Sequence, residues 1–295
     1  MSDVEKIVRD FYDNFGWVEK HGGLGEDSLF RYLSPPYYPY HKSVKARTMK
    51  CFEKISGKLL IAGGGDLRGI HSTIAQKFSA TTCLDISYKS LEIAKRKLKH
   101  KGEFILGSIL DIPKAENYFD AAYCAHVIFH IDRAFQAKAV RELIRAIRPG
   151  GLIVIIYANP DSLPLRIVKF KERIPLLRRI QRKKSLDKID TRERPPLYYF
   201  AYPLKWWSQF KDECDLELIP WDVMGNTEEK QILVNDAIAW LVYRFCSWFE
   251  DKHPKKAVQW WSYPIITLRK KSREDTLHRS ALSTALDLFL RSNRV

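Results

Sequence analysis

A run of glycines and a later aspartate are the first residues in the sequence that could bind a ligand. Gly63, Gly64 and Gly65 follow one apolar segment, and Asp85 ends the next, twenty residues beyond Gly65. Glycine lets backbone N–H groups approach a ligand where a Cβ atom would clash. An acidic residue at this spacing can accept both hydroxyls of a ribose. The pair predicts a nucleotide-type site, although dehydrogenases share this geometry and a tight turn beside an exposed aspartate would also fit.

Two histidines, His126 and His130, follow a later apolar segment and are the candidate general bases. Histidine changes its charge near neutral pH, so it can accept a proton from a nucleophile. The alternative is that one or both hydrogen-bond the backbone of the turn, and His130 fits this alternative better because it lies closer to the next helix. No cluster of carboxylates and histidines suggests a catalytic metal.

The elements that must position these residues alternate between strands and helices. Apolar runs predict strands at 58–62, 81–86, 103–106, 120–125 and 152–157, with helical patterns between them. The helix before the run 152–157 is expected to begin at Asp132 and to be ended by Pro149-Gly150-Gly151. Two more strands are expected near 216–221 and 265–268. The pattern predicts an α/β protein with a doubly wound, Rossmann-like, mostly parallel seven-stranded sheet.

Several further motifs give the site a chemistry. The segment 104–123 reads FILGSILDIPKAENYFDAAY, and Pro149-Gly150-Gly151 precedes the run 152–157. In this order and spacing, the motifs over residues 55–160 resemble class I S-adenosylmethionine-dependent methyltransferases of the bacterial small-molecule or glycan type. The resemblance implies a methyltransferase with S-adenosyl-L-methionine as its cofactor.

The resemblance also implies a role for individual residues. Asp85 would hold the ribose, Ile86 and Ile109 would contact the adenine, and the backbone from Cys124 to His126 would flank the cofactor on the substrate side. The remaining implied cofactor-binding residues are Gly63, Gly64, Gly65, Asp66 and Ser108.

Three positions depart from the family pattern. Ile61 stands where the family has an acid, Leu67 where it has a glycine, and Ser108 where an aspartate often contacts the adenine amino group. Asp66 could supply the carboxylate that Ile61 lacks. These departures leave a non-catalytic S-adenosylmethionine-binding relative as one alternative.

Composition limits the class of partner. The chain of 295 residues carries 50 Lys and Arg against 35 Asp and Glu, a formal net charge of +15. This excess favours anionic partners: nucleic acid, acidic lipid headgroups, or phosphorylated and sugar-nucleotide-like substrates. The five scattered cysteines form no CxxC pair, which favours reduced thiols and a cytoplasmic location.

The chain divides into three expected regions: a helical N-terminal cap or lid (1–55), the methyltransferase domain (56–271) and a helical tail (272–295). Tyr37, Tyr38, Tyr40 and His41 are expected either to form a lid over the substrate or to pack on the sheet edge. A basic insertion follows the fifth strand at 163–194. Its apolar and cationic residues predict two short amphipathic helices, hinged near Pro175, that could lie on an anionic membrane or simply pack on the domain.

The sequence therefore supports one leading hypothesis and one main alternative. The first is O-methylation of a small-molecule, glycan or lipid-linked acceptor, with peripheral contact at the inner membrane face. The alternative is an RNA-directed methyltransferase that uses the basic surface. The first is favoured because no base-methylation signature and no RNA-binding module is present.

Overall fold

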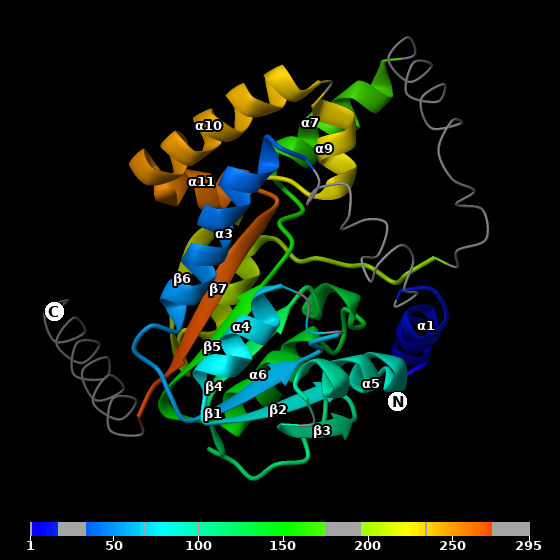
Figure 1. Ribbon diagram of the computed structural model, residues 1–295, viewed down its shortest axis with the longest axis vertical. Coiled ribbons are helices and arrows are strands. Elements are labelled where there is room, and N and C mark those ends of the chain that lie inside the picture. Colours follow the sequence, from blue (N-terminus) through cyan, green and yellow to red (C-terminus); the bar gives the residue numbers. More distant parts are fainter. Residues whose placement is uncertain are drawn as a thin grey trace, which may run out of the picture.

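A single sheet of seven strands organises the computed structural model, which describes residues 2–16, 34–65, 67, 69–99, 101–174, 196–233 and 235–272 (Figure 1). The strand order is β3-β2-β1-β4-β5-β7-β6, and only β7 runs antiparallel to its neighbours. The strands are β1 (Lys58–Ala62), β2 (Ala80–Asp85), β3 (Glu103–Leu106), β4 (Phe119–Ala125), β5 (Ile147–Ile156), β6 (Cys214–Asp222) and β7 (Tyr263–Lys270). The predicted fold class is confirmed.

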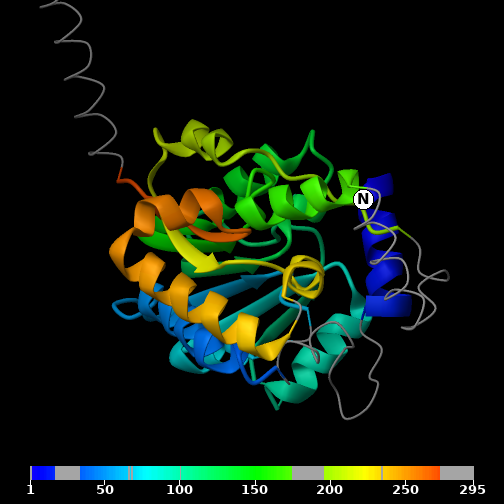
Figure 2. The same ribbon diagram turned by 90° about the horizontal axis from the view of Figure 1, so that it is seen from above.

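Helices surround the sheet on both faces and beyond the carboxyl ends of its parallel strands. The α-helices are α1 (Asp3–Phe11), α3 (Tyr37–Cys51), α4 (Ile70–Lys77), α5 (Tyr88–Lys97), α6 (Gln136–Ala146), α7 (Leu163–Arg173), α9 (Asn226–Ile232), α10 (Asp236–Lys252) and α11 (Pro254–Trp260). A π-helical turn (Tyr12–Gly16) extends α1, and two 3₁₀ segments span Ile128–His130 and Leu204–Phe210. Seen from above, α10 runs along one side of the molecule and α1 stands at the opposite side (Figure 2).

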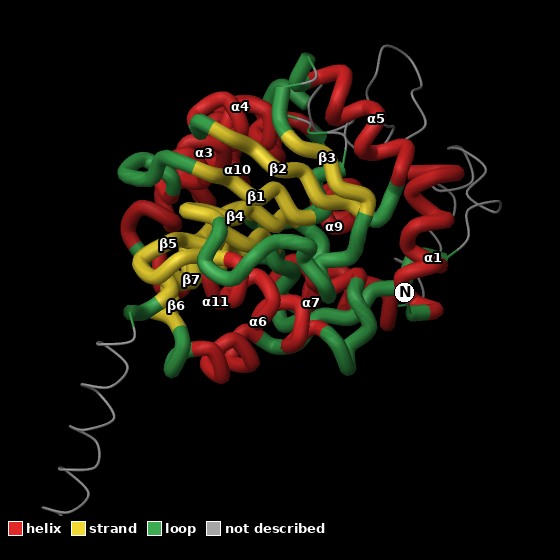
Figure 3. Tube along the Cα trace, turned by 90° about the horizontal axis from the view of Figure 1, so that it is seen from below, coloured by secondary structure: helices red, strands yellow, loops and turns green. Residues whose placement is uncertain are grey.

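The two faces of the sheet carry separate apolar clusters because strand side chains alternate between faces. Leu59 and Ile61 of β1 pack with α4 and α5, whereas Leu60 and Ala62 pack with α6 and the 3₁₀ segment Leu204–Phe210. Figure 3 shows the strands between α4 and α5 on one side and α6 on the other. Residues 152–156 of β5 are all buried, as expected for a central strand.

The sequence around Pro149-Gly150-Gly151 folds differently from the expectation. It does not end the preceding helix, since α6 stops at Ala146 and the three residues lie within β5. A Cβ atom on Gly151 would lie 2.7 Å from the carbonyl oxygen of Asp120. The glycine is therefore required by the close approach of β4 rather than by a helix end.

The predicted N-terminal cap is two separate structures. The π-helical turn that extends α1 contacts α5, whereas α3 packs against α10 and β6. Tyr37 and Tyr40 are buried there, and their hydroxyls donate to Asp222 (2.9 Å) and Glu250 (2.5 Å) respectively. The side chain of Tyr38 is exposed. Of the two alternatives for these tyrosines, the structure shows packing at the sheet edge.

The basic insertion is described only in its first part. Helix α7 begins after Ser162, with Pro164 in its first turn, and residues 175–195 lie outside the described residues. The expected second amphipathic helix beyond Pro175 and the C-terminal tail from 273 onwards lie outside them too. Within the described part of the chain, no helix is both long enough and apolar enough to span a membrane.

Candidate cofactor and active site

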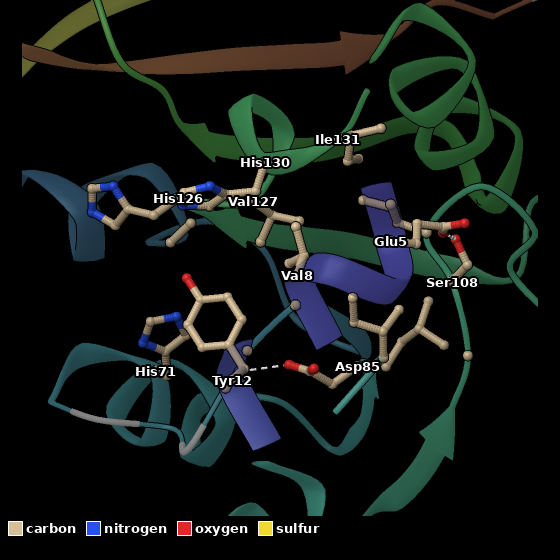
Figure 4. Close-up of a pocket in the computed structure, with 18 residues that line it drawn as sticks. Glu5, Val8, Tyr12, His71, Asp85, Ser108, His126, Val127, His130 and Ile131 are labelled. Carbon is tan, nitrogen blue, oxygen red and sulfur yellow. Dashed lines mark hydrogen bonds between the residues drawn. The ribbon is translucent and has the colours of Figure 1, made fainter. Parts of the chain in front are cut away.

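A cavity of about 290 Å³ opens at the carboxyl ends of β1, β2 and β4 (Figure 4). This edge is where ligands bind in open α/β sheets. Its wall brings together residues from five parts of the chain. They are Glu5, Val8, Tyr12, Gly63, Gly64, Gly65, His71, Leu84, Asp85, Ile86, Gly107, Ser108, Ile109, Ala125, His126, Val127, His130 and Ile131.

The glycine turn, predicted to bind the cofactor, lines this cavity. Gly63 and Gly65 have φ angles of +65° and +55°, in the left-handed region that glycine tolerates best. A Cβ atom on Gly63 would overlap the side chain of Val127. The Gly63 N–H donates to the carbonyl of Leu84 at 2.7 Å, so the turn is fixed to the end of β2.

Ile61 and Leu67, two of the positions that depart from the family pattern, both lie against Gly64 of this turn. Ile61 and Leu67 are both almost fully buried in one apolar cluster. A Cβ atom on Gly64 would lie 2.5 Å from Cγ2 of Ile61 and 3.1 Å from Cδ2 of Leu67. Leu67 keeps a positive φ of +53°, the backbone conformation that a glycine would favour. The turn therefore has an apolar underside, and its backbone path does not need a glycine at position 67.

Asp85 is the buried carboxylate of the site. Its oxygens accept hydrogen bonds from the backbone N–H groups of Gly65 (3.0 Å) and Ser87 (2.9 Å). Burial raises the pKa of Asp85 above its usual range, and these two hydrogen bonds oppose that rise only in part. The glycine turn and the aspartate thus form one unit, joined through the Gly65 N–H.

Helix α1 closes the cavity opposite the glycine turn; the sequence predicted a helical cap or lid over 1–55 but named no residue of this helix in the site. Glu5, Val8 and Tyr12 lie on one helical face and line the cavity. The Ser108 hydroxyl donates to the Glu5 carboxylate, whose other oxygen accepts the Ser2 N–H at 2.7 Å. The Ser2-x-x-Glu5 pattern is a capping box that signals a helix start, but it does not reveal where the helix docks.

Asp13 anchors the π-helical end of α1 to the start of α5. Its carboxylate accepts the Ser87 hydroxyl at 2.5 Å and contacts the backbone N–H of Lys89 at 3.4 Å. Ser87 is also the N-cap of α5 and follows Asp85 closely. The N-terminal helix is therefore held near its start by Ser108, and the π-helical turn that extends it is held by Ser87, two residues after Asp85.

The histidines and one tyrosine gather at the other end of the cavity. Nδ1 of His130 lies 2.7 Å from the carbonyl oxygen of Tyr198, so Nδ1 carries the proton and Nε2 remains an acceptor. Burial lowers the pKa of His130. The ring of Tyr12 is edge-on to that of His130 at 6.3 Å, and burial followed by the charge of Asp85 raises the pKa of Tyr12 to about 12.

His126 occupies an unusual backbone position at the end of β4. Its φ of +60° is rare for a residue with a side chain, and its N–H donates to the carbonyl of Ile156 at 3.1 Å. The imidazole lies among the rings of Trp221 (5.3 Å) and Tyr263 (5.1 Å). Both histidines line the cavity, and the backbone interaction expected as the alternative for His130 is also present.

Of the implied cofactor-flanking stretch from Cys124 to His126, Cys124 does not lie in the cavity wall. The side chain is fully buried in the apolar cluster on the α6 face, while its neighbours Ala125 and His126 line the cavity. Alternation along β4 places it on the opposite face. Asp66 lies outside the described residues. His71, which was missed, follows the glycine turn on α4 and lines the cavity.

Comparisons with known proteins agree with this geometry. Residues 62–155 match the family model described as a methyltransferase domain. Demethylmenaquinone methyltransferase from Lactococcus lactis is 27% identical over 43% of this chain, and the chain spans 53% of that protein's length. The ubiquinone/menaquinone biosynthesis C-methyltransferase UbiE from Francisella tularensis subsp. novicida is 25% identical, over 81% of this chain and 97% of that protein.

A solved structure shows the same fold. The N-methyltransferase NodS from Bradyrhizobium japonicum, in complex with S-adenosyl-L-homocysteine, covers 92% of this chain and all of its own, with a TM-score of 0.52 and 12% identity. The fold and the domain are those of the class I S-adenosylmethionine-dependent methyltransferases. The predicted class of fold and a methyltransferase domain with S-adenosyl-L-methionine as its cofactor are confirmed, and the bacterial small-molecule or glycan type stays a prediction.

The residues present fit that cofactor. A buried carboxylate, an apolar platform of Leu84, Ile86 and Ile109, and a turn whose glycine at position 63 leaves no room for a Cβ all line one cavity. These are the features that a ribose, an adenine ring and a close backbone approach require. Among the described residues no group of side chains suits a metal ion.

Proposed function

We propose that the protein is a methyltransferase that transfers the methyl group of S-adenosyl-L-methionine to a hydroxyl oxygen of an amphiphilic, lipid-linked or glycan-like acceptor. One observation carries the proposal. The glycine turn, Asp85 and two histidines line a single cavity at the carboxyl edge of the sheet. The cofactor, when bound, supplies a methyl group on a positively charged sulfur.

Some residues of the site bind the cofactor, and another accepts the proton of the acceptor hydroxyl. Asp85 accepts the ribose hydroxyls, and the Gly63–Gly65 backbone approaches the cofactor where side chains would clash. Nε2 of His130 is positioned as an acceptor because Nδ1 is committed to the Tyr198 carbonyl. The acceptor hydroxyl gives its proton to this nitrogen as its oxygen attacks in line. Helix α1 covers the cavity and limits the access of water.

Methylation at carbon is a second candidate, because the relative from Francisella is named a C-methyltransferase of ubiquinone and menaquinone biosynthesis. A quinol acceptor would use the same base, since loss of its phenolic proton activates the neighbouring ring carbon. The two candidates share an acceptor with an ionisable hydroxyl and differ in the atom that receives the methyl group.

The test is a transfer assay with methyl-labelled cofactor. Vesicles that contain a quinol, vesicles with a lipid-linked glycan, and transcribed RNA are offered separately, and the product is analysed by mass spectrometry and NMR. We expect label in a lipid fraction, on oxygen. Label on a ring carbon would select the second candidate, label in RNA would reverse the choice of acceptor, and failure to bind the cofactor in calorimetry would refute the methyltransferase function.

A further inference from the structure

Helix α10 is apolar on two sides, although only one side packs on the protein. The inner side includes Ala239, Tyr243 and Cys246, which are buried in a cluster with α3 and α11. The outer side follows the spacing i, i+3, i+7, i+10 and carries large apolar side chains. They are Ile238, Leu241, Phe245 and Trp248, exposed by 40%, 71%, 54% and 51% respectively. A soluble helix at a protein surface normally has a polar outer side.

The exposed stripe continues onto the next helix through aromatic contacts. Phe245 stacks on Phe249 with ring centroids 5.8 Å apart, and Phe249 stacks on Trp260 of α11 at 5.1 Å. Trp260 is itself 42% exposed. We call the residues Ile238, Leu241, Phe245, Trp248 and Trp260 the α10 patch. A contiguous apolar surface of this kind marks a binding surface rather than chance exposure.

The charges around the α10 patch are mostly positive. Arg244, Lys252, Lys255 and Lys256 are exposed at its border, against the exposed carboxylates of Asp236 and Asp251. Glu250 adds no charge to this surface, because it is buried and paired with Arg47 at 2.7 Å. Aromatic and aliphatic side chains bordered by Lys and Arg are the composition of a helix that lies in an anionic lipid interface.

A second helix in the layer beyond the sheet has the same construction. On α7, Leu163, Ile167 and Phe170 are exposed at helical spacing, and Arg166 and Lys169 are exposed beside them. Both helices lie beyond the carboxyl ends of the parallel strands (Figure 1). The cavity opens at this same edge of the sheet.

We propose that the α10 patch is a membrane-docking surface that binds anionic lipid headgroups with α10 lying parallel to the bilayer plane. Its apolar side chains enter the headgroup boundary, its tryptophans sit at the interface, and the bordering cations contact acidic lipids. This surface is independent of the proposed chemistry, because none of its residues lines the cavity.

The test is vesicle sedimentation of the full chain with phosphatidylglycerol–phosphatidylcholine vesicles and with pure phosphatidylcholine vesicles. The double variant Leu241→Gln/Phe245→Gln removes two exposed apolar side chains without touching the buried side of α10. We expect its partition coefficient on the anionic vesicles to fall by about tenfold or more. Tyr88→Gln, an equally exposed aromatic on α5, is the matched control and should leave the coefficient unchanged.

Salt and calorimetry complete the design. Raising the ionic strength should weaken binding, since the cations act through screened charge. Cofactor binding, measured by calorimetry, should be the same in all variants, so a failure of docking is distinguishable from a failure of the proposed function. The proposal is overturned if the full chain ignores anionic vesicles, if the double variant binds them as well as the wild type, or if sedimentation velocity shows a dimer that the double variant dissociates.

A second inference has an independent basis in Glu5 and rests on the proposed function. The aspartate that the family often places against the adenine amino group is Ser108 here, and the Ser108 hydroxyl is bonded to Glu5 from α1. Figure 4 shows the two side chains together at the cavity wall. Glu5 is only 6% exposed. We infer that the Glu5 carboxylate supplies the missing acidic contact and accepts a hydrogen bond from the adenine amino group.

The inference is tested by calorimetry with S-adenosylhomocysteine and with its inosine analogue, in which a carbonyl replaces the amino group. The wild type should prefer the adenine compound, and Glu5→Gln should reduce that preference by about tenfold. Ser108→Asp added to Glu5→Gln should restore it. An unchanged preference in Glu5→Gln overturns the inference. If Glu5→Gln weakens the binding of both compounds equally and Ser108→Asp does not restore it, Glu5 only holds α1 in place. If the wild type binds neither compound, the proposed function is contradicted instead.

Discussion

Replacement of Asp85 by asparagine separates the role of this residue in the cofactor site from its role in the fold. In the wild type, the Asp85 carboxylate accepts hydrogen bonds from the N–H groups of Gly65 and Ser87, and its remaining lone pairs can accept hydrogen bonds from a ligand in the cavity. An amide keeps one acceptor oxygen and turns an NH₂ group toward donors. At least one charge-assisted hydrogen bond to a ribose hydroxyl is lost and the other is weakened, about 2–4 kcal/mol in total, which corresponds to an approximately 30- to 1000-fold weaker cofactor affinity.

The fold should tolerate the same change. Because burial raises the pKa of Asp85, its ionised form is disfavoured in the folded state, and removal of the charge offsets part of the loss of hydrogen bonding. We expect the free energy of unfolding without cofactor to change by no more than about 1 kcal/mol. Titration calorimetry with S-adenosylhomocysteine and urea denaturation measure the two quantities on the same preparations.

Asp120→Asn provides a matched control at the opposite end of the sheet. Asp120 also accepts a backbone N–H, from Lys58 at 2.6 Å, and pairs with Arg148 at 2.5 Å. Burial alone would raise the pKa of Asp120, but the hydrogen bonds and charges of these two partners lower it overall. The ionised form therefore stabilises the fold, and this stability is lost as the pH falls through the lowered pKa. The control should lose about 1 kcal/mol and bind cofactor normally. An unchanged affinity in Asp85→Asn would refute the assignment of the ribose site.

Three further outcomes are expected from the geometry. His130→Asn should lower kcat by about 10²- to 10⁴-fold without loss of S-adenosylhomocysteine binding, because the general base is removed. Burial lowers the pKa of His130, so the acid limb of the wild-type pH–rate profile should lie below pH 6.5. A pH–rate profile that is unchanged in the variant excludes this role. Gly63→Ala should abolish cofactor binding, since its Cβ would overlap Val127 at a positive φ, and calorimetry that finds normal affinity contradicts this account. Tyr40→Phe removes one hydrogen bond from the Glu250 carboxylate, which keeps Arg47 and Trp261, and takes away the acceptor of the buried Val223 N–H. It should lower the free energy of unfolding by about 1–3 kcal/mol in urea titrations, whereas a neutral result would mean that water or another group replaces the hydroxyl.

The sheet could be read from the sequence because buried parallel strands are short apolar runs at regular spacing. The expected bounds of β1 and β3 match the structure, those of β4 differ by one residue at its start, and those of β2 are shifted by one residue at both ends. The helix expected from Asp132 begins only at Gln136 in the structure. The start of β5 was misplaced because Pro-Gly-Gly resembles a helix stop, and only the close packing of Gly151 on β4 distinguishes the two cases.

The site residues that lie at the ends of strands were predicted from the sequence, and those that α1 brings from a distant part of the chain were not. Gly63–Gly65, Asp85 and His126 follow strands directly, so the sheet topology alone brings them together. Glu5 and Tyr12 reach the cavity through the docking of α1, a tertiary contact that local pattern does not encode. Cys124 was misassigned for the opposite reason: it is adjacent in sequence to site residues, but strand alternation places it on the other face.

The paired contact of Ile61 and Leu67 with Gly64 has a consequence for engineering by family consensus. A carboxylate introduced at position 61 alone would be buried against the leucine without a partner, and a glycine at 67 alone would leave a void of leucine size, so each change separately should cost about 2–5 kcal/mol. Made together, the two substitutions remove the leucine that obstructs the acid. A double-mutant cycle should therefore give a coupling energy well away from zero. A variant designed from the family consensus should therefore change positions 61 and 67 together.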